Sequence, residues 1–331
     1  MIRWGILGAG GIAGTVAPDI AATPGHAVHA VAARDADRAA AFAAAHGAAR
    51  SYGSYAELVA DPDVDVVYVA TTHGQHHEHA RLALHADKPV LVEKAFALNA
   101  GQARDIVALA RERQLFCMEA MWTRLNPLIR TALDLVAGGR IGDVLGARTD
   151  LSRYFPYDPA SRLFDLAAGG GALLDMGIYP VTVAWLFLGR PDTVAATGSL
   201  SPTGSDLTTA LQWGYADGRI AQIYTSAAGT SPLAAVITGT EGWLAIEPRI
   251  HRPQRLLVHE RAHGTNEGHT EEVSGPPAEG NGYRLEVAEV GRCLEAGLLE
   301  SPFVPLDETV AILEVLDEAR RQVDVRYPSE V

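Results

Sequence analysis

An acid and a base stand side by side in the stretch LVEKAFAL, residues 91 to 98, where Glu93 and Lys94 interrupt a mostly apolar run. A lysine in an apolar setting is costly unless it is paired or used in chemistry. Lys94 is therefore a candidate functional residue. Glu93 is expected to support the turn or to pair with a neighbouring cation.

A second chemical signal is the stretch GILGAGGIA, residues 5 to 13, which follows an apolar strand-like run and opens a helix-like one. Its pattern is Gly-x-Gly-x-x-Ala. The first glycine permits a tight turn, the second lets the backbone approach a pyrophosphate, and the small third residue lets the helix pack on the strand. Helix N-terminal amides would then face the anion. We predict a dinucleotide site at Gly8, Gly10, Gly11, Ile12 and Ala13.

The choice of cofactor depends on the end of the second strand, in AVAARDADR, residues 30 to 38. NAD binders place an acid there, against the ribose 2′-hydroxyl. Here the position is Ala33, followed by Arg34, with Arg38 one helical turn later. Two guanidiniums can hold a 2′-phosphate, so NADP is preferred. Asp35 leaves NAD open, although an N-cap role for the next helix is the favoured interpretation.

Alternating apolar runs and alanine-rich amphipathic stretches in the first 120 residues predict βα units around a parallel sheet. The expected strands cover residues 2–7, 27–33, 64–70, 89–92 and 115–118. The expected helices cover residues 12–22, 36–46, 55–59, 75–85 and 100–113, with Asn99 as an N-cap.

The pattern changes after about residue 125. A helix-like stretch at 127–137 precedes strand-like runs that follow one another without helices, which predicts a mostly antiparallel sheet. These runs lie at 142–154, 193–200, 207–215, 219–226, 234–239 and 242–247. Residues 262–281 are expected to form a surface loop. The final helices are expected at 282–295 and 306–322.

Length and composition set limits on the class of protein. A chain of 331 residues favours two domains. A net charge of −13 repels nucleic acid and anionic membranes. No uninterrupted apolar run reaches the roughly 18 residues of a membrane span, and no signal peptide is recognised. The two cysteines, Cys117 and Cys293, lie far apart and favour a reducing compartment. We expect a cytoplasmic protein.

A set of motifs in order resembles a known family across essentially the whole chain. They are the glycine pattern, ATTHGQHH at 70–77, the Glu-Lys pair, MEAMWTR at 118–124 and GGGALLDMGIYP at 169–180. The chain resembles the glucose–fructose oxidoreductase, inositol dehydrogenase and MocA family. MEAMWTR and ESPFVPL at 300–306 are most similar to its branch of dihydrodiol dehydrogenases and NADP-dependent D-xylose dehydrogenases.

The resemblance implies an α/β fold. A Rossmann domain with a doubly wound parallel sheet covers residues 1–122. An α/β domain with an open, mostly antiparallel sheet covers residues 123–331, and its last helices return to the first domain. This second domain would bind substrate and form a homodimer through its sheet.

The resemblance also implies roles for individual residues. It makes Lys94 the catalytic lysine, Tyr179 the general acid/base and Asp175 a residue that positions the substrate or the lysine. On electrostatic grounds, an ammonium near a tyrosine favours the phenolate and makes proton transfer workable at neutral pH. Ala95 stands where the family usually has proline, and Gly177 and Pro180 leave a regular helix face at Asp175 unassured.

The remaining implied site residues lie on loops. Thr71, Thr72 and His76 would line the cofactor loop, as would Glu93 and Lys94. Trp122, Arg124 and Phe155 would line the substrate pocket with Asp175 and Tyr179, and Tyr157 is a weaker candidate. Without the resemblance, a core aromatic, a surface charge and a packed core tyrosine are the ordinary interpretations of Trp122, Arg124 and Tyr179.

The four histidines of THGQHHEH, residues 72–79, invite a metal hypothesis. No cysteine lies nearby and no HExxH pattern is present, so no metal is expected. His77 and His79 are expected to be solvated helix positions.

The leading hypothesis is an NADP-dependent dehydrogenase that moves a hydride between NADP and a secondary alcohol of a cyclic polyol. The substrate would be a trans-dihydrodiol or an aldopyranose such as D-xylose. Two alternatives remain open: a weakly catalytic Rossmann-fold regulatory protein that binds the cofactor, and an NAD-dependent inositol or sugar dehydrogenase.

Overall fold

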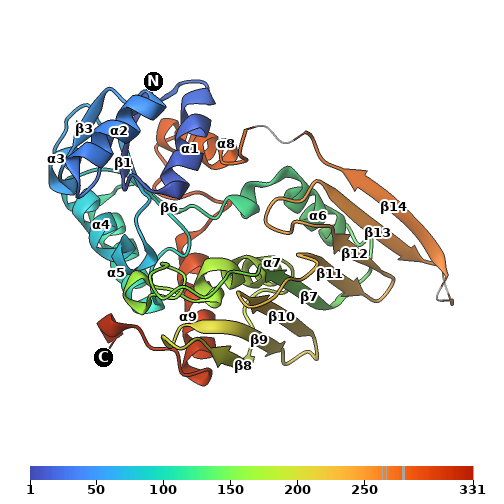
Figure 1. Cartoon of the computed structure of the whole chain (residues 1–331). Coiled ribbons are helices and arrows are strands. Elements are labelled where there is room, and N and C mark those ends of the chain that lie inside the picture. Colours follow the sequence, from blue (N-terminus) through green and yellow to red (C-terminus); the bar gives the residue numbers. More distant parts are fainter. Residues whose placement is uncertain (263, 266, 278–279, 331) are drawn as a thin grey trace. The chain divides into compact units, whose positions relative to one another are not determined.

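The computed structural model describes residues 1–262, 264–265, 267–277 and 280–330, which form two compact units. The first unit comprises Met1–Trp122 and Ala278–Val310, and the second comprises Thr123–Pro277 and Ala311–Val331. Each unit is built around one β-sheet (Figure 1).

The first unit contains a six-stranded parallel sheet in the order β3-β2-β1-β4-β5-β6. Its strands are β1 (Ile2–Leu7), β2 (His26–Ala32), β3 (Arg50–Tyr52), β4 (Val66–Val69), β5 (Val90–Val92) and β6 (Cys117–Glu119). The order reverses between β1 and β4, which is where open α/β sheets bind ligands at the carboxyl ends of their strands. All four residues of β4 are buried, as expected for a strand covered on both faces.

Helices connect these strands. They are α1 (Gly11–Ala22), α2 (Ala36–His46), α3 (Tyr55–Val59), α4 (His73–His85) and α5 (Ala100–Arg113), together with α8 (Arg284–Glu295). Asp35 caps α2 by accepting from the Asp37 and Arg38 N–H groups, and Asn99 caps α5 by accepting from Gln102 N–H. Both predicted caps are confirmed. The helix α9 (Leu306–Gln322) begins in the first unit and ends in the second.

The second unit contains an eight-stranded sheet in the order β14-β13-β12-β11-β7-β10-β9-β8. Only the pair of β7 and β10 is parallel among the described strand pairs. The strands are β7 (Val144–Ser152), β8 (Thr193–Leu200), β9 (Asp206–Gly214), β10 (Ile220–Ser226), β11 (Ala235–Gly239), β12 (Gly242–Ile246), β13 (Arg255–Arg261) and β14 (Gly268–Ser274). The predicted fold class, with a mostly antiparallel second sheet, is confirmed.

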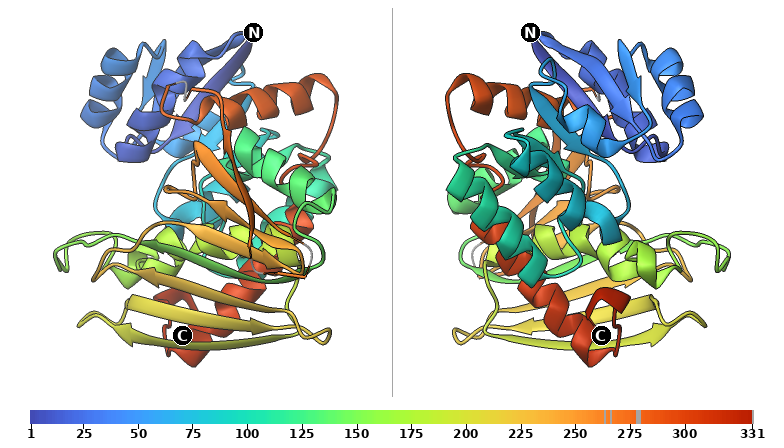
Figure 2. Two further views of the ribbon diagram at one scale, coloured as in Figure 1. Left: turned by 90° about the vertical axis from the view of Figure 1, so that its right-hand side faces the viewer. Right: turned by 90° about the vertical axis from the view of Figure 1, so that its left-hand side faces the viewer.

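Helices of the second unit cover one face of this sheet. They include α6 (Pro127–Ala137), a π-helical turn at Leu173–Gly177, α7 (Ile178–Leu188) and short 3₁₀ turns at Trp122–Leu125, Leu166–Ala168 and Pro328–Glu330. The helix α7 packs on β7 and β10. In Figure 2, α7 and the end of α9 lie on one side of β8, β9 and β10, and the described part of the chain places no helix on the other side.

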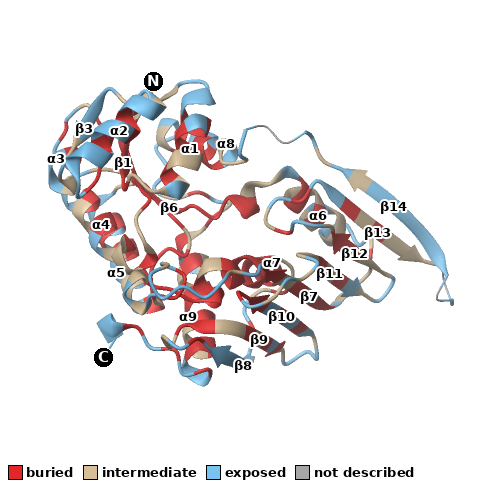
Figure 3. Ribbon diagram, in the orientation of Figure 1, coloured by how far each residue is buried: buried red, intermediate tan, exposed pale blue. Residues whose placement is uncertain are grey.

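One prediction for the second unit was wrong, and one reservation about it was justified. The loop expected at 262–281 contains the strand β14, although residues 263, 266, 278 and 279 lie outside the described part. The helix face at Asp175 is indeed irregular, because Asp175 lies in a π-helical turn that ends at Gly177. The regular helix α7 follows, since Pro180 lies in its first turn, where a missing N–H is tolerated. Figure 3 shows β14 as largely exposed and α7 as buried.

The segment Leu166–Leu188 is long and apolar enough to cross a membrane by length and composition, with a mean hydropathy of 1.5. In the structure, 83% of its most apolar window is buried. A helix that is apolar all round is typical of a protein core as well as of a membrane span. Here the segment packs as the central helix of the second unit.

Carboxyl groups are buried in the core of the first unit. The Tyr68 hydroxyl donates a hydrogen bond to Glu93 Oε1, and both side chains are buried. Glu286 of α8 is 0% exposed, and neither of its carboxyl oxygens has a hydrogen-bond partner among the described residues. Burial, followed by the charges of Glu93 and Asp19, raises the pKa of Glu286 well above its usual value. The surroundings of Glu286 therefore favour its protonated, neutral form.

The raised pKa of Glu286 predicts a pH-dependent stability. The folded protein holds this proton more tightly than the unfolded chain, so stability present at low pH falls as pH rises from about 4.3 through the folded pKa. Glu286→Gln is neutral throughout. Its free energy of unfolding, measured by urea denaturation between pH 4 and pH 9, should gain on wild type as pH rises.

Glu112→Gln, a change at an exposed glutamate of α5, is the matched control and should not alter the pH profile. A Glu286→Gln curve parallel to wild type would contradict the assignment.

Candidate functional site

The glycine-rich loop joins β1 to α1 and has the geometry of a dinucleotide site. Gly8 has φ +105°, and a Cβ there would lie 2.8 Å from the Ala70 carbonyl oxygen. A Cβ at Gly10 or Gly11 would meet nothing within 4 Å, so the backbone can be approached closely. Gly10 is the N-cap of α1 and provides no side-chain cap, which leaves first-turn N–H groups for an anion. These residues fit a bound pyrophosphate.

The neighbouring residues of the loop serve its packing. Ala13 is fully buried, as a close approach of helix and strand requires, whereas Ile12 is partly exposed.

Two exposed guanidiniums lie at the end of β2 and the start of α2. Arg38 donates to the Ala9 carbonyl at 3.2 Å, which ties it to the glycine-rich loop. Arg34 and Arg38 both lower the pKa of Tyr55, although burial raises it more, so both charges act on the same ring. The Asp35 carboxylate accepts hydrogen bonds from the N–H groups at the start of α2. The exposed guanidiniums of Arg34 and Arg38 are groups suited to bind a phosphate.

The loop after β4 links the glycine-rich loop to the Lys94 turn. Thr71 Cγ2 would lie 3.2 Å from a Cβ at Gly8, and Thr72 is the N-cap residue of α4. His76 Nε2 lies 3.1 Å from the Thr71 carbonyl, and its Nδ1 lies 2.9 Å from the Ala95 carbonyl. Burial, and then the charge of His73, lowers the pKa of His76 to about 3. The neutral ring has one N–H, so one of these carbonyls receives the hydrogen bond.

The other histidines of this helix divide by burial. His79 is buried, with Nδ1 3.0 Å from Thr71 Oγ1 and its ring edge-on to Tyr55. Its assignment as a solvated position was wrong. His77 is partly exposed and lies 2.6 Å from Asp105 Oδ2. His73 Nε2 lies 3.2 Å from the Lys94 carbonyl.

Lys94 is the only partly exposed residue in an otherwise buried run from Val90 to Leu98. It follows β5, at the carboxyl edge of the parallel sheet, and the Lys94–Ala95 peptide bond is cis. Its neighbour Glu93 accepts a hydrogen bond from the Tyr68 hydroxyl, and the Glu93 N–H donates to the Val69 carbonyl at 3.0 Å. Burial raises the pKa of Glu93, against the Tyr68 hydrogen bond and the Lys94 charge.

The second unit holds Asp175 and Tyr179 on consecutive turns of one helical segment. Asp175 lies in the π-helical turn and pairs with Arg162 at 3.0 Å. Tyr179 is 9% exposed, and its ring centroid lies 5.3 Å from that of His251. Arg162 and His251 were missed from the sequence, because nothing in their local pattern reports a partner so distant along the chain.

The predicted pocket residues occupy different settings. Trp122 is buried and stacks on Tyr283 at 4.5 Å in the first unit. Arg124 is 4% exposed, so its ordinary interpretation as a surface charge was wrong. Phe155 is partly exposed beneath Arg153, and Tyr157 is 46% exposed, edge-on to Phe164. The last two lie on the loop after β7.

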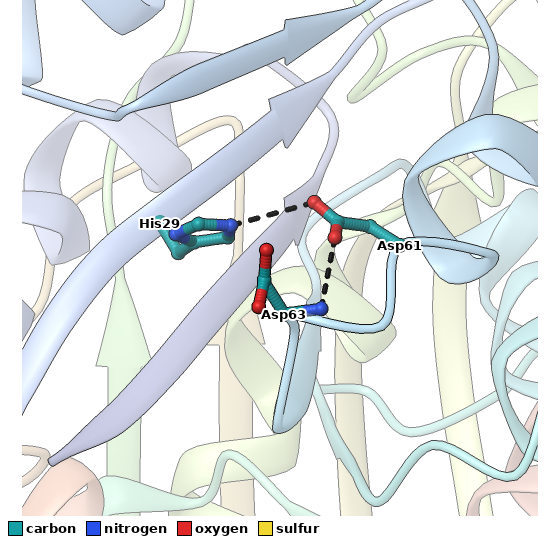
Figure 4. A group of neighbouring side chains, drawn as sticks. All are labelled: His29, Asp61 and Asp63. Atoms are coloured by element: carbon teal, nitrogen blue, oxygen red, sulfur yellow. Dashed lines mark hydrogen bonds and ion pairs between the residues drawn. The ribbon is translucent and has the colours of Figure 1, made fainter.

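One group in the described part of the chain has metal-ligand chemistry, and it includes none of the four histidines of residues 72–79. His29 Nε2, Asp61 and Asp63 offer ligand atoms within 4.8 Å of one another (Figure 4). Arg50 pairs with Asp61 at 2.9 Å and with Asp63 at 2.8 Å, and Arg3 also pairs with Asp63. These guanidiniums already neutralise the carboxylates, so the group is an ion-pair network.

The first unit thus brings the glycine-rich loop, the two arginines, the Thr71 loop and the Lys94 turn to the carboxyl ends of β1, β2, β4 and β5. This arrangement can bind a dinucleotide through backbone amides and guanidiniums. The second unit brings together a phenol, a carboxylate and an imidazole, which are groups able to hold and move protons.

Comparison with known proteins agrees with this geometry. Residues 2–121 match an oxidoreductase family with an NAD-binding Rossmann fold, and residues 129–245 match the GFO/IDH/MocA C-terminal domain. The chain is 36% identical to trans-1,2-dihydrobenzene-1,2-diol dehydrogenase of Mus musculus, over 99% of both chains.

Solved structures share the fold over nearly the whole chain. The 3-ketoreductase KijD10 of Actinomadura kijaniata, solved with NADP, has a TM-score of 0.85 and 26% identity, covering 97% of this chain and 98% of its own. A levoglucosan dehydrogenase has a TM-score of 0.86 at 20% identity, with 97% and 98% covered, and supports the fold alone. The chain belongs to the GFO/IDH/MocA family of oxidoreductases with an NAD-binding Rossmann fold.

Proposed function

We propose that the protein is an NADP-dependent dehydrogenase that oxidises or forms a secondary alcohol on a cyclic polyol. The substrate class is a trans-dihydrodiol or an aldopyranose such as D-xylose. The observation that carries this proposal is Lys94, the partly exposed cation in the buried run at the carboxyl end of β5. The full-length likeness to diol dehydrogenases supports the choice of substrate class.

The reaction needs a hydride acceptor and a base. NADP, which the glycine-rich loop, Arg34 and Arg38 would hold, would supply the hydride acceptor for the carbinol carbon. Tyr179 takes the hydroxyl proton, so the alcohol loses one hydride and one proton and becomes a carbonyl. A free tyrosine has a pKa of about 10, and the family resemblance gives Lys94 the role of supplying the positive charge that favours the phenolate. Asp175, held by Arg162, positions the substrate hydroxyls.

The preference for NADP is supported by the corner that contains Arg34 and Arg38. Both are exposed, and Arg38 is fixed to the glycine-rich loop. Asp35, which could have served the ribose of NAD, caps α2 instead. A 2′-phosphate would be held by charge-assisted hydrogen bonds from the guanidiniums.

We also propose a cytoplasmic homodimer that pairs through the helix-free face of the second sheet. Cys117 and Cys293 are free and buried, which suits a reducing compartment. On the helix-free face, Ile220 and Tyr224 of β10 are 48% and 41% exposed, beside a hollow of about 720 Å³. Exposed apolar side chains on an open sheet are typical of an interface.

Removing either catalytic group should stop turnover without removing the cofactor. Lys94→Ala and Tyr179→Phe are each expected to lower kcat by about 10²–10⁴-fold, the usual contribution of acid–base catalysis, with NADPH affinity within a few fold. An absorbance assay of NADPH with a panel of dihydrodiols, pentoses and inositols measures this. Lys88→Ala, before the other end of β5, is the control, since Lys88 donates to the Asp61 and Val64 carbonyls, away from the Lys94 turn.

Near-normal turnover in Lys94→Ala or Tyr179→Phe would remove these roles. No turnover by the wild type despite tight NADPH binding would favour the regulatory alternative.

Arg34→Ala should weaken NADPH binding by about tenfold or more and leave NADH nearly unchanged, because a hydrogen bond to a charged group contributes about 1.5–3 kcal/mol. Fluorescence titration with each nucleotide measures the two dissociation constants. Arg104→Ala, at an exposed arginine of α5, serves as the control. Equal losses for both nucleotides would return NAD to first place.

Tyr224→Glu should convert a dimer to a monomer in sedimentation equilibrium, because an unpaired carboxylate buried in an interface is costly. Tyr157→Glu alters a tyrosine of similar exposure outside the sheet and should leave the mass unchanged. A monomeric wild type, or a Tyr224→Glu variant that stays dimeric, would reject this interface.

A further inference from the structure

The start of the helix that carries Asp175 and Tyr179 is held by a carboxylate from another strand. Asp206, the first residue of β9, is 1% exposed. Its Oδ2 accepts from the Leu173 N–H at 2.7 Å and from the Thr209 hydroxyl at 3.2 Å. Leu173 is the first residue of the π-helical turn, so Asp206 acts as an N-cap from 33 residues away.

The glycine loop before this helix is shaped to admit the Asp206 carboxylate. Gly171 has φ +133°, and a Cβ there would lie 2.2 Å from Asp206 Oδ1. That oxygen is buried and has no hydrogen-bond partner among the described residues. Any side chain at Gly171 would displace the carboxylate from Leu173. The third glycine of the GGG run is thereby explained by Asp206.

A second contact holds the same loop from the C-terminal segment. The hydroxyl of Tyr327, which is fully buried, donates to the Gly170 carbonyl at 3.1 Å. Arg320 of α9 lies over the Tyr327 ring at 4.7 Å and pairs with Asp317 and Glu330. The loop is therefore fixed at Gly170 by Tyr327 and at Leu173 by Asp206.

The helix is also tied to the sheet about two turns beyond the anchor at Leu173. The Thr149 hydroxyl of β7 donates to the Pro180 carbonyl at 3.0 Å. Tyr179 is six residues after Leu173, about 9 Å along a helix, so an axial or rotational shift at Leu173 moves the phenol directly. A carboxylate at a helix N-terminus is also favoured by the helix dipole.

We propose that Asp206 is a positioning residue of the active site, which sets the placement of Asp175 and Tyr179 through the Leu173 N–H, with Tyr327 holding the preceding glycine loop. The inference rests on the catalytic role proposed for Tyr179. No atom of Asp206 needs to touch the substrate for this role.

The charge state of Asp206 gives the role a measurable signature. Burial raises its pKa to about 6, against the Leu173 and Thr209 hydrogen bonds and the charge of Arg320. Tyr327 is the other titratable group whose interaction with Asp206 is resolved, and Asp317 and Glu330 balance Arg320. Above about pH 6 the cap is an anion, and below it the protonated acid holds the Leu173 N–H more weakly.

The test combines kinetics with amide hydrogen exchange. Asp206→Ala should lower kcat by about 100-fold with little change in NADPH affinity, the loss expected from a displacement near 1 Å. Exchange of amides in residues 171–176, followed by mass spectrometry, should accelerate at least about tenfold. Asp206→Asn keeps an acceptor for Leu173 and should restore most of both, while losing the step in kcat near pH 6.

Matched tyrosine variants extend the test to the second contact. Tyr327→Phe removes only the hydroxyl at Gly170 and should accelerate exchange in residues 169–173 with a smaller loss of kcat. Tyr215 donates to the Gly189 carbonyl at 2.9 Å, at the far end of α7. Tyr215→Phe should therefore alter exchange near Gly189 and leave kcat unchanged. If Asp206→Ala does not fold, the Asn and Phe variants still decide the matter.

Unchanged exchange in residues 171–176 of Asp206→Ala would overturn the anchor itself. Faster exchange with wild-type kcat would make Asp206 merely structural, and a retained pH step in Asp206→Asn would do the same. Failure of the proposed function would be seen in a different variant. Tyr179→Phe would then keep its turnover, independently of the hydrogen-exchange results for the Asp206 variants.

Discussion

A buried carboxyl group lies behind each of the two predicted catalytic side chains, and the local geometry depends on how that group is satisfied. In the first unit, Glu93 is adjacent to Lys94 and accepts from the Tyr68 hydroxyl. In the second unit, Asp206 accepts from Leu173 at the start of the helix that carries Tyr179. Removing a carboxyl group from water is costly unless it accepts a hydrogen bond. The hydrogen bond that each of these carboxyl groups accepts therefore holds the donor segment in place.

The parallel sheet explains why the first unit gathers its functional loops. Successive βα turns of a parallel sheet emerge at one edge, so residues distant in sequence become neighbours. Gly8 approaches Ala70 and Thr71, and His76 spans from Thr71 to Ala95. The buried neutral ring of His76 therefore lies between the loops after β4 and β5 and donates to one of the two carbonyls. This use of His76 requires no metal, and it accounts for a histidine on the inner face of α4.

Local pattern predicted the elements whose residues repeat with a clear period. The helices at 36–46, 55–59, 100–113 and 127–137, and the strand at 193–200, form with the predicted bounds. The short strand β3 and the edge strand β14 were missed, because an exposed edge strand such as GHTEEVS carries little apolar alternation. The helix α7 was hidden for the opposite reason, since it is buried nearly all round and lacks an amphipathic period.

The site residues that stand out by type and spacing were predicted from the sequence. Those whose role depends on a partner distant in the sequence were missed. The glycine pattern, Arg34 and Lys94 stand out by type and spacing. Asp206 resembles any acid at the start of a strand, and its partner Leu173 is an apolar residue that contributes only its backbone. Glu286 likewise looks like an ordinary acid in the first turn of α8. The local sequence does not show whether a carboxyl group is buried or which donor hydrogen-bonds to it.

The number of donors decides which buried acid keeps its charge. Glu286 is buried, has no hydrogen-bond donor among the described residues and interacts with the charges of Glu93 and Asp19, so its pKa rises well above the usual value and its neutral form is favoured. Asp206 is as deeply buried but has two donors and the charge of Arg320, so its pKa rises only to about 6. The surroundings therefore favour the neutral acid at Glu286, whereas near pH 7 Asp206 is an anion at the helix start. The anion is the state that a helix N-terminus stabilises. Burial is therefore a cost to stability at Glu286, whereas at Asp206 it orients the helix that carries Tyr179.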